Sequence, residues 1–67
     1  MSEYELIFQD ENEEYIDDLQ VTMPSYYAIW EVGINMMPHF PKAKSVLVNR
    51  IEDGNVLESM IITVTDR

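Results

Sequence analysis

The residues of this chain best suited to chemistry are six carboxylates packed into positions 10–18. They are Asp10, Glu11, Glu13, Glu14, Asp17 and Asp18. A pair of carboxylates can serve as acid and base in catalysis, but only within a cleft that raises the pKa of one of them. A chain of 67 residues has room for one small core and rarely encloses such a cleft. We therefore interpret the segment as a binding surface and not as a catalytic one.

The same segment bears a partial likeness to a calcium-binding loop. Asp10, Asn12 and Glu14 place oxygen ligands at alternate positions, as such loops do. The sixth position of the loop requires glycine and the twelfth requires glutamate, but Tyr15 and Val21 stand there. The sequence predicts no specific metal site.

Other catalytic motifs are missing from the sequence. His39 is the single histidine, and one histidine cannot build a histidine-rich metal site. No Gly-x-Ser-x-Gly motif surrounds any serine, and with two glycines the chain has no glycine-rich phosphate loop. We expect no enzymatic activity and no cofactor.

The charge balance favours a protein partner. Thirteen acidic residues against four basic ones give a net charge of −9, which should repel nucleic acid and anionic membranes but attract a basic protein surface. If residues 10–18 were helical, neighbouring carboxylates would be spaced by about 5–6 Å, comparable to successive phosphates of a nucleic-acid strand. The favoured hypothesis is a small acidic inhibitor or modulator, of the kind phages and mobile elements encode, that blocks a nucleic-acid-binding surface. The plainer alternative is an ordinary solvated acidic face.

The location predicted from the sequence is the cytoplasm, or the host cytoplasm for a phage-encoded protein. The chain contains no cysteine, in keeping with a reducing compartment. Its longest apolar stretch is far shorter than the ~20 residues needed to span a bilayer. The N-terminus lacks the basic region of a signal peptide.

The N-terminal half predicts a strand and a helix. Residues 4–8 alternate and favour a strand, whereas residues 10–20 fit a loop, a short helix or a returning strand equally well. Thr22 or Ser25 can cap a helix over residues 26–37, which should stop before Pro38. Residues 39–44 then form a connector.

The C-terminal half predicts a β-hairpin. Two β-rich runs, residues 45–51 and 56–65, flank an Asp53-Gly54 pair typical of a type I′ turn. This turn pairs Ile51 with Val56 and brings Leu47 near Met60. Both hairpin faces are apolar, and we expect the richer one to cover the helix. It carries Leu47, Ile51, Val56, Met60, Ile62 and Val64, against Val46, Val48, Leu57 and Ile61 on the other. The expected fold is a single α+β domain, residues 1–67, with a small antiparallel sheet on one helix.

The predicted helix carries more apolar surface than one core needs. The helical spacing predicts an inward face of Tyr26, Ile29, Trp30, Gly33, Ile34 and Met37. Gly33 in a helix interior suggests close approach by a neighbouring element. The opposite flank, Ala28, Val32 and Met36, is also apolar, so we predict that it joins the acidic segment in partner binding. The alternative function is a homo-oligomeric structural or accessory protein, a homodimer for example, that uses this flank and the hairpin.

Overall fold

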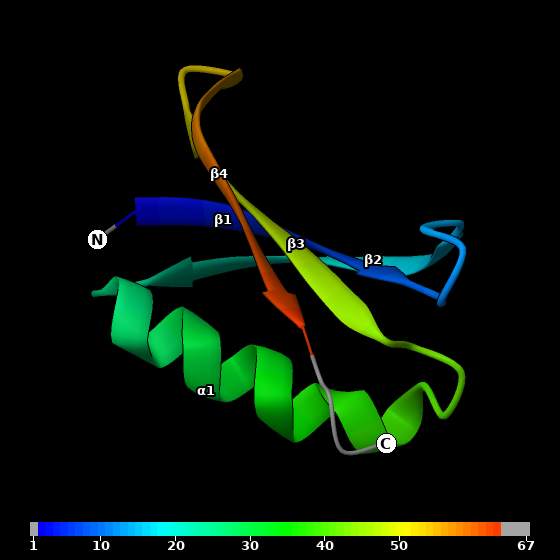
Figure 1. Cartoon of the computed structure of the whole chain (residues 1–67). Coiled ribbons are helices and arrows are strands. Elements are labelled where there is room, and N and C mark those ends of the chain that lie inside the picture. Colours follow the sequence, from blue (N-terminus) through cyan, green and yellow to red (C-terminus); the bar gives the residue numbers. More distant parts are fainter. Residues whose placement is uncertain (1, 64–67) are drawn as a thin grey trace.

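The computed structural model describes residues 2–63, and it has the predicted α+β fold. One helix lies across one face of a four-stranded antiparallel sheet with strand order β2-β1-β3-β4 (Figure 1). The elements, in chain order, are β1 (Ser2–Gln9), β2 (Tyr15–Met23), α1 (Tyr26–Met36), the 3₁₀ turn η1 (Met37–His39), β3 (Ser45–Glu52) and β4 (Asn55–Thr63). Within the described residues, no helix is both long and apolar enough to cross a membrane.

The acidic segment forms a turn followed by a strand, which settles the alternatives left open by its sequence. Asp10 closes the turn, because its Oδ1 accepts the backbone N–H groups of Asn12 at 2.8 Å and of Glu14 at 3.0 Å. Glu13 adopts the left-handed region with φ of 62°. β2 then returns alongside β1, with Leu6 opposite Leu19.

The helix begins and ends close to the predicted residues. Ser25 is the N-cap: its backbone is extended, and its Oγ accepts the N–H of Ala28 at 3.3 Å. α1 ends at Met36, and Pro38 lies within the η1 turn that follows. The connector then returns over the core, where the Phe40 ring stacks on Phe8 with centroids 4.5 Å apart.

The C-terminal hairpin has the predicted turn but a different register beyond it. Asp53 and Gly54 have φ of 53° and 80°, the positive values of a type I′ turn, and Ile51 pairs with Val56 as predicted. Leu47, however, pairs with Ile61 and not with Met60. The cause is a β-bulge, in which one extra residue, Leu57, enters β4 between the partners of Arg50 and Ile51.

The bulge decides which hairpin face meets the helix. A shift of one residue moves a strand's side chains to the opposite face, so Met60 and Ile62 join Val46 and Val48. The prediction that the face of Leu47 covers the helix is therefore wrong. The buried apolar residues are Tyr4, Leu6, Phe8, Ile29, Met37, Ala43, Val46, Val48 and Ile62.

The helix is also rotated relative to the prediction. Ile29, Gly33 and Met37 are buried as expected, but Trp30 is 45% exposed and Ile34 is 36% exposed, so their assignment to the core is wrong. Val32 and Met36 pack against the core on the other side of the buried row. Gly33 faces the sheet, where a Cβ would lie 3.8 Å from both Leu6 Cδ2 and Ile62 Cδ1.

Candidate protein-binding surfaces

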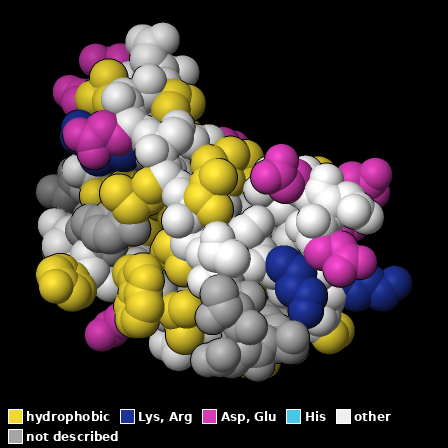
Figure 2. Space-filling model, in the orientation of Figure 1, with side chains coloured by type: hydrophobic (Ala, Val, Ile, Leu, Met, Phe, Trp, Pro, Cys, Tyr) yellow, Lys and Arg dark blue, Asp and Glu magenta, His cyan; other side chains and the backbone are white. Residues whose placement is uncertain are grey.

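Acidic residues are concentrated in the N-terminal hairpin of this fold, although two lysines lie beside it. The first 23 residues contain no lysine or arginine, and residues 2–23 form β1, β2 and the turn between them. Their acidic residues are Glu3, Glu5, Asp10, Glu11, Glu13, Glu14, Asp17 and Asp18. We call residues 10–18, with their six carboxylates, the acidic hairpin. Lys42 and Lys44 line a depression together with Asp10 and Glu11 of the turn. Acidic side chains gather at this end of the molecule, with basic side chains beside them (Figure 2).

The carboxylates of the acidic hairpin divide into two groups. Asp10 holds the turn, Asp17 Oδ1 accepts the backbone N–H of Asp18 at 2.8 Å, and Asp18 Oδ1 accepts the Tyr15 hydroxyl at 3.0 Å. Asp17 and Asp18 are exposed, as are the three glutamates of the turn, Glu11, Glu13 and Glu14. The aspartates accept hydrogen bonds within the hairpin, whereas these glutamate side chains accept none from the described residues, so the glutamates are the side chains best placed to meet a partner.

The hairpin does not present a single row of carboxylates. Asp17 lies opposite Phe8 and Asp18 opposite Ile7, so the two aspartates occupy opposite faces of the sheet. The helical spacing considered from the sequence does not occur. The negative charge instead surrounds the end of the molecule from both sides of the sheet.

Sequence reasoning missed two acidic residues beside the hairpin. Glu3 and Glu5 lie on the face of β1 that points away from α1, the same face as Asp18. Glu5 Oε1 accepts Asn49 Nδ2 at 3.3 Å, and Asn49 Oδ1 accepts the Ser59 hydroxyl at 2.6 Å. The alternation that predicted β1 could have identified this face. Tyr4, Leu6 and Phe8 point to the core, so the residues between them point the other way.

The acidic surroundings also act on Tyr15. Its hydrogen bond to Asp18 raises the pKa of the phenol above the usual 10.0, with smaller contributions from desolvation and from the charges of Asp18, Asp17 and Glu5. The neutral phenol is a donor that holds the Asp18 carboxylate in place.

The predicted apolar flank of the helix is only partly available. Ala28, Val32 and Met36 are half-buried, and Val32 and Met36 pack against the core. Among the side chains of α1 that the structure describes, the exposed large apolar ones are Tyr27, Trp30 and Ile34. Hydrophobic side chains gather over α1 and β4 in Figure 2. The apolar surface therefore lies around Trp30 and along β4.

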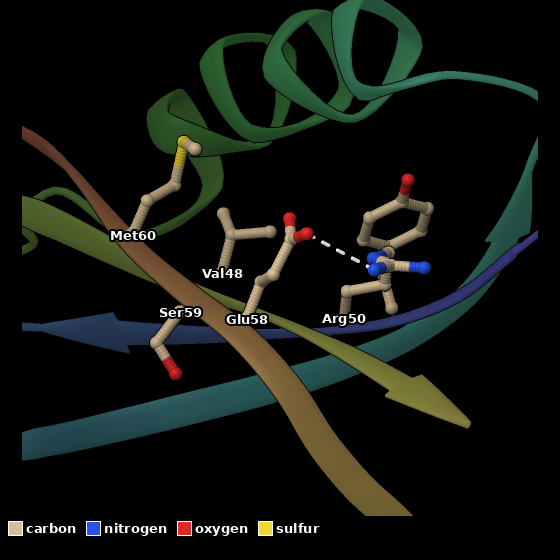
Figure 3. A pocket seen from close by; sticks show the side chains of 6 residues that line it. Val48, Arg50, Glu58, Ser59 and Met60 are labelled. Carbon is tan, nitrogen blue, oxygen red and sulfur yellow. Dashed lines mark hydrogen bonds and ion pairs between the residues drawn. The ribbon is translucent and has the colours of Figure 1, made fainter. Parts of the chain in front are cut away.

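A small cavity lies over β3 and β4, and the helix passes above it in Figure 3. Arg50 Nη2 and Glu58 Oε1 lie 3.0 Å apart there, beside Val48 and Met60. Its volume of about 10 Å³ leaves room for no more than a single water molecule. This cavity is too small for an organic ligand. Two larger, open depressions have volumes of about 440 and 450 Å³, and the first lies between the acidic turn and Pro41, Lys42 and Lys44.

Comparison with known proteins finds no matching family model, no matching curated protein and no matching solved structure.

Proposed function

We propose that this protein binds a target protein through its acidic hairpin and thereby blocks a basic, nucleic-acid-binding surface of that target. The observation that supports the proposal is the concentration of acidic side chains at one end of the fold: six carboxylates lie within residues 10–18, Glu11, Glu13 and Glu14 are exposed, and the cations that border the turn are Lys42 and Lys44. Such a surface is attracted to clustered lysines and arginines, and the same field repels nucleic acid. This protein and nucleic acid would therefore compete for the same surface of the target.

The chemistry of the hairpin favours electrostatic steering over a buried ion-pair network. The glutamates of the turn are exposed, and exposed charges mainly raise association rates and set salt dependence. Their attraction is screened within a Debye length of about 8 Å at physiological salt. Binding should accordingly weaken as salt rises.

A matched pair of charge variants tests the proposal. Glu11→Gln/Glu14→Gln removes two charges from the acidic hairpin, and Glu31→Gln/Glu52→Gln removes two exposed charges from α1 and the end of β3. With the target captured from host lysate, the hairpin variant should associate roughly tenfold more slowly at low salt and show a flatter salt dependence. The control variant should keep most of the wild-type rate.

Competition with nucleic acid completes the experiment. Excess oligonucleotide should displace the wild-type protein from the captured target. Equal association rates for the two variants would mean that only the net charge of the protein matters, and not the position of the carboxylates. Failure of nucleic acid to compete would rule out a shared basic surface.

A further inference from the structure

The outer edge of β4 is an open sheet edge. β4 ends the strand order, and within residues 2–63 no strand pairs with its outer side. An edge strand of 9 residues leaves a row of backbone N–H and C=O groups directed away from the sheet. Such an edge is a ready template for another strand.

β4 is protected only along its first half. Edges are usually protected by lysine, proline, β-bulges or inward charges, and β4 has a bulge at Leu57 and the inward-facing Glu58. Residues 59–63 contain none of these features, and β4 exposes apolar side chains on both sheet faces. These are Val56, Leu57, Met60 and Ile61, of which Ile61 is 59% exposed. The charged residue of the strand, Glu58, is paired with Arg50 of β3. β2, at the other edge, carries Asp17 and Asp18.

The charge distribution permits a second copy at this edge despite the net charge of −9. The acidic hairpin belongs to the opposite side of the sheet. With strands about 4.8 Å apart, two copies joined at β4 would hold their β2 strands roughly 34 Å apart. That separation is several Debye lengths at physiological salt, about 8 Å each. Pairing through β2 would instead bring the two acidic hairpins together.

We propose that two copies of this chain form a symmetric dimer by antiparallel pairing of β4 with β4, which creates a continuous eight-stranded sheet. A two-fold axis at Ser59 places Leu57 opposite Ile61 of the second copy and Glu58 opposite Met60. An axis at Glu58 would set two carboxylates against each other. This inference stands apart from the proposed function and does not depend on it.

The oligomeric state tests the dimer directly. Sedimentation of the full chain should give twice the monomer mass of 7.9 kDa at micromolar concentration. Ile61→Lys places a charge on the edge, and should weaken dimerisation at least about tenfold. The control is Tyr27→Lys on α1, at a side chain that is 82% exposed, and it should leave the dimer intact. A wild-type monomer at all concentrations would overturn the proposal, as would equal dimerisation of the two variants.

Cross-linking tests the register, and it remains informative if the lysine variant fails to fold. The chain has no cysteine, so Ser59→Cys introduces a single thiol beside the proposed axis. Directly opposed residues of an antiparallel pair are close enough for a disulfide. Ser59→Cys should form a covalent dimer on oxidation, and Thr22→Cys on β2 should not. A folded Ser59→Cys protein that stays monomeric on oxidation would overturn the Ser59-centred pairing.

Discussion

Ile29 and Trp30 are neighbours in α1 with opposite environments: Ile29 is completely buried, whereas Trp30 lies at the surface. The helix is turned so that Ile29 and Gly33 are buried, with Gly33 facing Leu6 of β1 and Ile62 of β4, while Trp30 and Ile34 lie outside the core. The largest side chain of the chain therefore contributes less to the core than the isoleucine before it.

This difference predicts unequal effects of truncation. Ile29→Ala should destabilise the fold by about 2–5 kcal/mol, because it leaves a cavity in the core. Trp30→Ala should cost about 1 kcal/mol, since much of the indole is already in water. Chemical denaturation of both variants measures the two costs. A larger cost for Trp30→Ala would place the indole in the core.

Gly33→Ala should stabilise the protein. A Cβ at this position would meet Leu6 Cδ2 and Ile62 Cδ1 at 3.8 Å, which is ordinary contact, and alanine is about 1 kcal/mol better than glycine within a helix. We expect a gain of about 0.5–1 kcal/mol in thermal or chemical unfolding.

Gly54→Ala is the matched control for that substitution. Gly54 has φ of 80° in the β3–β4 turn, a conformation that alanine adopts only with strain. Gly54→Ala should therefore destabilise the protein by about 1 kcal/mol, whereas Gly33→Ala should stabilise it. Destabilisation by Gly33→Ala would mean that the helix lies closer to the sheet than described.

Tyr15 should titrate above the usual phenol pKa of 10.0, because its neutral form donates to Asp18. Because the pKa of Tyr15 is higher in the folded state than in the unfolded state, its hydrogen bond to Asp18 stabilises the fold. That stabilisation is complete at pH values below the pKa of the unfolded state, and it is lost as the pH rises through the pKa of the folded state. Asp18→Ala should return the Tyr15 pKa towards 10.0, as followed by NMR of the tyrosine rings. Glu5→Gln, which removes the smallest contribution, should lower it much less.

The local signals in the sequence were sufficient for most of the elements. Alternation predicted β1, Pro38 predicted the end of α1, and Asp53-Gly54 predicted the hairpin turn, each through its own backbone chemistry. For the helix start the sequence offered Thr22 or Ser25, and the structure selects Ser25.

Packing decided what these local signals could not. The bulge at Leu57 reverses the faces of β4 beyond it, and the rotation of α1 exposes Trp30. Both depend on how the helix meets the sheet. For the candidate site, composition identified the acidic segment, but the division between structural aspartates and exposed glutamates required the geometry of the turn at Asp10.

The strand order also governs how the chain folds. The hairpins β1–β2 and β3–β4 join residues close in sequence and can form early, but the central β1–β3 pairing joins Glu5 to Asn49, 44 positions away. Closing that loop lowers the entropy of the chain before the contacts of the core can stabilise it. Such non-local pairing therefore slows folding. The rate-limiting event is thus expected to be the meeting of two preformed hairpins beneath the helix, with Leu6 and Val48, partners at the centre of the sheet, among the first contacts to be committed.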